Sequence, residues 1–163
     1  MTAGDTHTGR RGGTPVGYIT ELDAVSAAAV LYFRLWCEGA GERAQVESDF
    51  RVHLGPEAGR AAVRGLSELC ALCARHGRRP LMRHGVTCRC LGGDECCFAT
   101  LVGAAAEGDR EDALMLAMTM IRADMAPAVV GLAEGFGLAL KRMALAALPS
   151  DAMTDPKTPE TIH

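Results

Sequence analysis

The hydrophobic positions along this chain recur at steps of three and four residues over most of its length. Between about residues 18 and 38 this spacing connects the side chains Ile19, Leu22, Val25, Ala29, Phe33 and Trp36. Residues at such steps lie on one face of a helix. The same pattern predicts helices at about 42–54, 56–76, 95–106, 109–122 and 127–147. The fold class predicted is therefore all-α, a compact bundle of five or six helices.

Glycine and proline set the expected ends of these helices. Gly55-Pro56 separates the second helix from the third, and Gly77 ends the third because glycine suits helix ends and proline suits the first turn. The helix that follows Asp109 is apolar nearly all round, so we expect it in the centre of the bundle.

The segment from Val86 to Leu101 allows two interpretations. Asp94 can cap a helix over 95–106, since a carboxylate accepts hydrogen bonds from the free N–H groups of a first turn. The alternative is a short β-hairpin at 86–101, with VTCRCL and CCFATL paired across GGDE.

The length of 163 residues is that of one domain. Residues 17–148 are predicted to form a single helical domain that contains a basic, cysteine-rich loop at 75–97. Residues 1–16 and 149–163 hold little that could be buried, so we expect both to be disordered tails.

Composition narrows the classes of partner. With 48% hydrophobic and 23% charged residues and a net charge of -3, the chain has no general attraction for nucleic acid or anionic membrane. Charged residues interrupt its apolar runs, and its first residues lack the apolar core of a secretory signal. We therefore expect a cytoplasmic protein that does not span the membrane. In that reducing compartment its 7 cysteines indicate metal ligands, redox thiols or core residues before disulfides.

The strongest chemical signal is a group of soft ligands close together in sequence. They are His84, Cys88, Cys90, Cys96 and Cys97. Zinc takes four thiolate or imidazole ligands, so this segment predicts a thiolate-bound metal site with zinc as the favoured cofactor. The Cys88-x-Cys90 spacing departs from the more common Cys-x-x-Cys.

Three other cysteines fit packing better than chemistry. Cys70 and Cys73 have ligand-like spacing with His76, but they continue the apolar stripe of Val63 and Leu66. Free cysteine is often a small buried hydrophobe, so we expect both thiols in the core, facing the central helix. Cys37 has no partner nearby in sequence, and we expect it to pack as well.

A redox interpretation uses the same loop. Nearby arginines and a helix N-terminus stabilise thiolates, so the alternative function is a thiol-redox sensor or thiol enzyme that uses Cys90 with Cys96 or Cys97. A catalytic cysteine paired with His84 lacks any orienting residue that the sequence can name. On these grounds the sequence favours a non-enzymatic protein over an enzyme.

The loop is also basic, and it contains no acidic residue between Arg75 and Arg89. Its arginines are Arg75, Arg78, Arg79, Arg83 and Arg89. They could contact an anionic ligand or a protein partner, while the lack of interleaved aromatic residues disfavours nucleic acid.

A second alternative function places DNA binding at residues 129–146. Ala133 and Gly137 have the spacing seen in a helix-turn-helix, which would make a metal- or redox-responsive regulator. Only Lys141 and Arg142 could then contact DNA, and the unbroken apolar stripe favours one continuous helix. The function that we expect is instead a non-enzymatic regulatory or protein-interaction module with a metal site.

Overall fold

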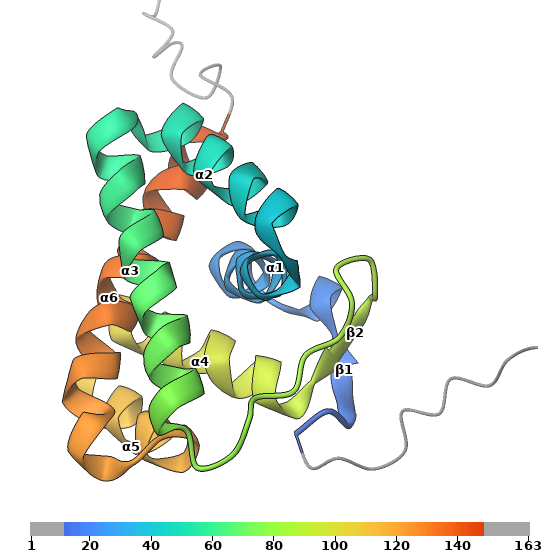
Figure 1. Ribbon diagram of the computed structural model, residues 1–163, viewed down its shortest axis with the longest axis vertical. Helices are drawn as coiled ribbons and strands as arrows, with labels where there is room; N and C mark the ends of the chain where they lie inside the picture. The colour runs from blue at the N-terminus through green and yellow to red at the C-terminus, as the bar shows by residue number, and fades with distance from the viewer. Residues whose placement is uncertain (1–11, 149–163) are drawn as a thin grey trace, which may run out of the picture.

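Six α-helices make up most of residues 12–148, the part of the chain that the computed structural model describes (Figure 1). They are α1 (Ala24–Glu38), α2 (Ala40–Leu54), α3 (Pro56–His76), α4 (Gly93–Glu107), α5 (Arg110–Met120) and α6 (Ala126–Ala146). Two short 3-10 helices, η1 (Ile19–Glu21) and η2 (Ala123–Met125), precede α1 and α6. The predicted all-α bundle of five or six helices is confirmed.

The helix in the middle of the bundle is α1, which Figure 1 shows end-on with the other elements around it. Asp23 caps its N-terminus, where the carboxylate accepts hydrogen bonds from the backbone N–H groups of Val25 and Ser26 at 3.0 Å. Ala29 and Val30 are fully buried. The predicted helix from residue 18 is too long at its start, because residues 15–21 form a strand and a 3-10 turn.

The prediction that the helix after Asp109 lies in the centre is wrong. Only Ala113, Ala117 and Met120 of α5 are buried, whereas Met115 is 63% and Met118 39% exposed. Helix α3 packs mainly against α2 and α6.

Helix α6 packs against both α3 and α4 through a continuous buried stripe that includes Val130, Ala133, Phe136 and Leu140. Over Ala123–Ala146 the chain is long and apolar enough to cross a membrane by length and composition alone, the one such helix within residues 12–148. A buried core helix of a soluble protein passes the same test, and the buried stripe of α6 is consistent with that case.

A two-stranded antiparallel sheet joins the start of the described chain to the start of α4. β1 (Pro15–Tyr18) pairs with β2 (Cys90–Gly92), with Tyr18 opposite Cys90. The β-hairpin alternative at 86–101 is therefore wrong, because residues from Gly93 onward are helical and the partner of β2 comes from the other end of the chain. The predicted tails at 1–16 and 149–163 lie outside the described residues, apart from 12–16, of which Pro15 and Val16 are the first residues of β1.

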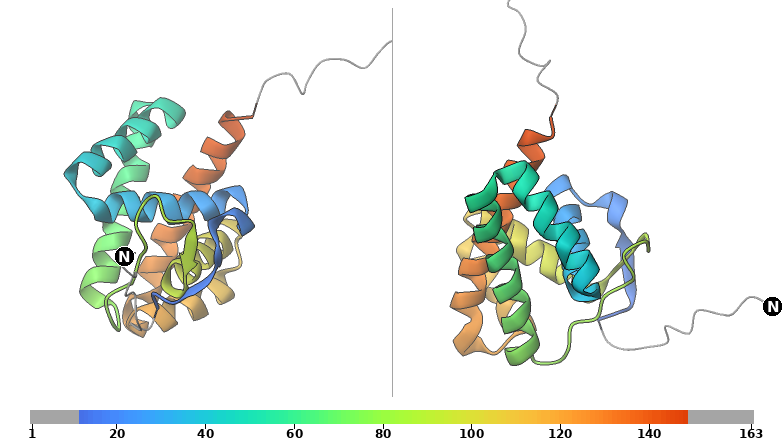
Figure 2. Two further views of the ribbon diagram at one scale, coloured as in Figure 1. Left: turned by 90° about the vertical axis from the view of Figure 1, so that its right-hand side faces the viewer. Right: turned by 45° about the horizontal axis from the view of Figure 1, so that its top comes forward.

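Between α3 and β2 the chain runs from Gly77 to Arg89 with one isolated bridge, Gly77 to Ile121, and is otherwise irregular. We call residues 78–89 the connecting loop. It is shorter than the predicted 75–97 loop, because α3 extends to His76 and α4 begins at Gly93. Figure 2 shows it passing across α1 beside the small sheet.

Candidate functional site

A buried ion pair holds the connecting loop against α1 and α4. Arg34 from α1 and Glu95 from α4 are both fully buried, and Arg34 Nε donates to Glu95 Oε1 at 2.6 Å. Arg34 Nη2 donates to Glu95 Oε2 at 2.8 Å, so the pair is bidentate.

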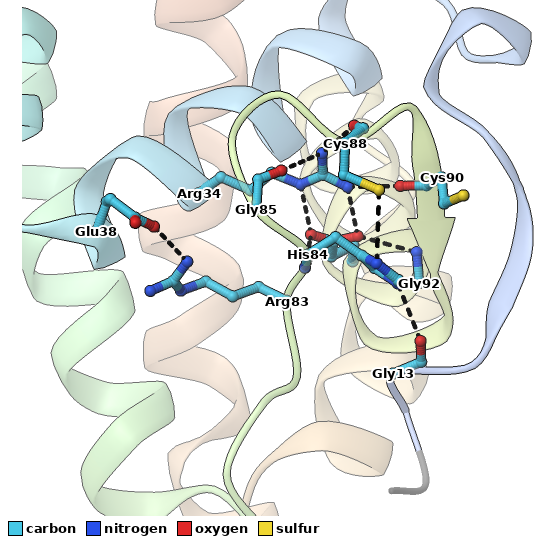
Figure 3. A network of polar contacts seen from close by, with 10 residues as sticks. Gly13, Arg34, Glu38, Arg83, His84, Gly85, Cys88, Cys90 and Gly92 are labelled. Atoms are coloured by element: carbon cyan, nitrogen blue, oxygen red, sulfur yellow. Dashed lines mark hydrogen bonds and ion pairs between the residues drawn. The ribbon is translucent and has the colours of Figure 1, made fainter. Parts of the chain in front are cut away.

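The rest of the Arg34 guanidinium binds the backbone of the connecting loop and of the first residue of β2 (Figure 3). Nη1 donates to the carbonyl oxygens of Gly85 at 3.1 Å and Cys88 at 2.6 Å, and Nη2 donates to that of Cys90 at 2.6 Å. An arginine has five N–H donors, and each has an acceptor here. Burial of this charge is therefore compensated.

Glu95 is satisfied in the same way. Its carboxylate also accepts hydrogen bonds from the backbone N–H of His84 and of Gly92, both at 2.9 Å. Burial opposes ionisation of this carboxyl, but the hydrogen bonds from Arg34, Gly92 and His84 outweigh it, so the pKa of Glu95 lies below its usual value. Sequence placed Glu95 near the start of a helix, where its bond to Gly92 is the reach-back expected of a third-position glutamate.

Asp94, which we expected to cap α4, anchors the loop instead. Its two carboxylate oxygens accept from Arg79 Nη1 and Nη2, both at 2.7 Å, and one also accepts from the backbone N–H of Met82 at 2.7 Å. The backbone N–H of Asp94 donates to the carbonyl of Gly12 at 2.8 Å. Asp94 and Glu95, at the start of α4, therefore both hold the connecting loop, and the backbone of Asp94 also holds the N-terminal segment.

Within the loop that these contacts hold in place, the His84 side chain faces that of Cys88. Cys88 Sγ lies 3.8 Å from His84 Nδ1, and His84 Nε2 lies 2.9 Å from the carbonyl oxygen of Gly13 (Figure 3). A carbonyl can only accept, so in the neutral ring Nε2 carries the proton and Nδ1 presents its lone pair to the thiol. Gly13 is thus the orienting group that the sequence alone could not name.

The other three predicted ligands lie apart from this contact. Cys90 is at the start of β2, Cys96 packs beside the small cluster of Val30, Leu91 and Ala99, and Cys97 packs against the main core. Burial raises the pKa of the Cys97 thiol. Within residues 12–148 no three His, Cys, Asp or Glu side chains gather as a metal site would require, and the zinc prediction stays a prediction.

The predicted arginine surface is largely engaged by the protein itself. Arg79 binds Asp94, Arg83 pairs with Glu38 at 2.7 Å, and Arg78 Nε donates to the carbonyl of Met118 at 2.8 Å. Arg75 bonds back to its own helix, and Arg89 is exposed.

The cysteines assigned to packing divide into two kinds. Cys73 is buried as predicted, and burial raises the pKa of its thiol to about 11. Cys37 and Cys70 are half-buried, and both pack against the main core. The prediction that Cys37 packs is confirmed, because its side chain lies against the main core.

The helix-turn-helix geometry considered for residues 129–146 is absent, because α6 runs unbroken through Gly137. A Cβ at Gly137 would lie 2.7 Å from Ala106 Cβ and 2.8 Å from Val102 O. This glycine therefore serves a close crossing of α4 and α6, and DNA binding keeps no structural support from that motif.

Sequence reasoning missed Arg34, Glu95 and Gly13. One signal was available for Arg34, which interrupts the apolar run YFRLW on a helix that is otherwise core; a charge at such a place is normally paired. Comparison of the chain with protein-family models, with curated proteins and with solved structures found no match.

Proposed function

We propose that this chain is a small, non-enzymatic regulatory module that senses hydroperoxides through the thiol of Cys88. The observation that supports this proposal is the contact of 3.8 Å between Cys88 Sγ and His84 Nδ1, with the imidazole oriented by Gly13. A base beside a thiol, itself held by a third group, is the arrangement that activates a sulfur nucleophile.

The chemistry needs only these groups and a peroxide. His84 Nδ1 takes the proton of the Cys88 thiol, and the thiolate attacks one peroxide oxygen. The S–O bond forms as the O–O bond breaks, and the leaving hydroxide takes the proton from His84 to become water. Sulfur is oxidised to the sulfenic acid and the peroxide is reduced.

The surrounding bonds give this oxidation a structural consequence. The carbonyl of Cys88 is bound by Arg34, and its backbone N–H donates to Gly85 O at 3.0 Å. The oxidised Cys88 side chain is larger than the thiol. It therefore has to fit into a loop whose backbone is held at both the N–H and the carbonyl of Cys88. We propose that the loop shifts and that a partner protein reads the change, with the exposed Arg89 of the loop as a contact.

We place the module in the cytoplasm, where a sensing thiol is kept reduced until an oxidant arrives. All 7 cysteines are free thiols in the structure, which suits that state.

Zinc is the second candidate, and one observation favours it. A histidine that binds a metal through one ring nitrogen commonly donates the other N–H to a carbonyl, as His84 does to Gly13. His84 and Cys88 would supply two ligands, whereas structural zinc takes four. Within residues 12–148 the ligand set fits zinc only in part.

Trapping of sulfenic acid tests the proposal. The reduced full-length chain is treated with near-stoichiometric hydrogen peroxide and dimedone, and each cysteine is quantified by peptide mass spectrometry. We expect Cys88 to be labelled first. His84→Gln keeps the backbone bond to Glu95 but removes the base, so it should slow labelling roughly tenfold or more.

Cys96→Ala is the matched control, since it removes a half-buried thiol outside the His84 contact. It should leave labelling of Cys88 unchanged. Labelling of Cys88 no faster than that of Cys96 in the native chain would refute the sensor. Stoichiometric zinc in protein purified without added metal, together with protection of Cys88 until chelation, would favour the metal site instead.

A further inference from the structure

A basic cleft lies near the junction of α2 and α3 and shares no residue with the Cys88 site. The two helices meet at Gly55 and diverge from there (Figure 1). The cleft has a volume of about 560 Å³, and its charged side chains are Glu47, Arg51, Arg60 and Arg64. Sites for small molecules have volumes of roughly 300–1,000 Å³. We propose that this cleft binds a small organic diphosphate.

The close approach of α2 and α3 brings the arginines of both helices to the same cleft. A Cβ at the buried Gly59 would lie 2.8 Å from Phe50 O and 2.9 Å from Arg51 Cα, so the two backbones pass directly against each other there. Arg60 and Arg64 are one helical turn apart, and residues at that spacing share a face. Three guanidinium groups from two helices therefore line one cavity.

These three arginines have no acceptor within the described protein. Arginines elsewhere donate to carboxylates or to backbone carbonyls, as Arg79 does to Asp94 and Arg78 does to Met118. Within residues 12–148, the side chains of Arg51, Arg60 and Arg64 make no hydrogen bond or ion pair. Their donors and their charge are therefore free to bind a ligand in the cleft.

The chemistry of the lining selects an anion with more than one phosphate. Guanidinium groups match phosphate oxygens with two parallel hydrogen bonds. Three positive charges against the one negative charge of Glu47 leave the lining with an excess of +2, which a diphosphate group can offset. Pro56 and Val63 also line the cleft and give the organic part of the ligand an apolar contact. A concave site of this size suits a small molecule better than a duplex.

Isothermal titration calorimetry of the reduced full-length chain tests this proposal, with ADP, pyrophosphate and adenosine as probes. We expect ADP and pyrophosphate to bind at one site, ADP more tightly because of the apolar contact, and adenosine not to bind. Binding should weaken as the salt concentration rises, because salt screens exposed charges. Adenosine that binds as tightly as ADP, or no binding of ADP and pyrophosphate at low salt, would overturn the proposal.

Arg60→Gln and Arg64→Gln should each weaken ADP binding roughly tenfold or more, because each removes hydrogen bonds between charged groups. Neither should change the melting temperature, since neither arginine has a partner within the described protein. Glu47→Gln should tighten ADP binding, because it removes a negative charge that faces the phosphates. Loss of the fold cannot produce that increase in affinity.

Arg110→Gln is the matched control, since Arg110 also makes no side-chain bond within residues 12–148 but lines a separate, acidic cleft with Glu111 and Asp112. It should bind ADP as the unmodified chain does. Cys88→Ser should also bind ADP unchanged, which separates this cleft from the peroxide sensor. An ADP affinity that Arg60→Gln and Arg64→Gln leave unchanged, or a preference for duplex DNA over ADP that both variants remove, would refute the diphosphate site.

Discussion

Arg34 has no solvent contact, and its partners come from α4 and from the connecting loop. A buried charge is tolerated only while its compensation is complete, because transfer of an unpaired ion out of water costs several kcal/mol. The loop has almost no regular secondary structure of its own. Its position therefore depends on this one guanidinium more than on any property of the loop sequence.

Arg34→Met should lower the free energy of unfolding by about 3–5 kcal/mol, because it leaves the carboxylate of Glu95 buried without its counter-charge. Urea titration followed by circular dichroism gives the value. Arg122→Met is the control, since its ion pair with Asp124 is 63% and 58% exposed and should be worth less than about 1 kcal/mol. Equal losses in the two variants would contradict the importance given to the buried pair.

The lowered pKa of Glu95 predicts a pH dependence of stability. A carboxyl with a depressed pKa in the folded state contributes stability above its unfolded value, roughly 4.3 for glutamate. That stability is lost as the pH falls through the folded pKa. Urea titrations from pH 7 to pH 3 should therefore show a falling free energy of unfolding below about pH 4. Glu95→Gln should show a smaller fall, and an identical fall in both proteins would refute the assignment.

At the scale of the helices, the crossing of α4 and α6 is set by a residue without a side chain. Gly137 lies in the buried face of α6, where Val102 and Ala106 of α4 approach its backbone. Gly135 lies two residues earlier on the same helix and is exposed. A Cβ added there would have no neighbouring residue within 4 Å. The two glycines therefore separate the effects of packing and of helix propensity.

Gly137→Ala should destabilise the protein by about 1–3 kcal/mol, because the new methyl group forces the two helices apart. Gly135→Ala should stabilise it by up to about 1 kcal/mol, since alanine is the better helix former at an open position. Thermal unfolding of both variants measures the difference. Changes of the same sign in the melting temperatures of the two variants would show that α4 and α6 do not approach closely at Gly137.

The helices were predictable because their signals are local. Gly55-Pro56 and Gly77 mark the ends of α3 in the sequence itself, and the apolar stripe of α6 runs unbroken. β1 was missed because it is a short strand whose partner lies at the far end of the loop. α5 was misplaced because its methionines count as apolar in a pattern but are partly exposed on the molecule.

The site was predictable only in part, for the same reason. Sequence singled out His84 and Cys88 because they are near each other in the chain. It missed Arg34 with Glu95, because that pair depends on how α1 packs against α4. Proximity across helices is a property of the fold and leaves no spacing to find.

At the scale of the whole molecule, the basic charge is used for cohesion. Arg34 binds Glu95 and Arg79 binds Asp94, both on α4, and Arg83 binds Glu38 at the end of α1. These three arginines are committed to contacts within the molecule, whereas Arg75 and Arg89 are exposed. The proposed signal acts through the Cys88 thiol in the connecting loop.

The backbone N–H groups of Met82, His84 and Gly92 share an unusual acceptor, since all three donate to carboxylate oxygens of Asp94 or Glu95. Their exchange with deuterium therefore reports on the release of the loop from two adjacent side chains, separately from the opening of any helix. The three amides should exchange with one common opening free energy, smaller than that of buried amides in α6, as a single cooperative unit. Oxidation of Cys88 should speed all three together and leave α6 unchanged, which amide exchange followed by NMR would detect one proton at a time.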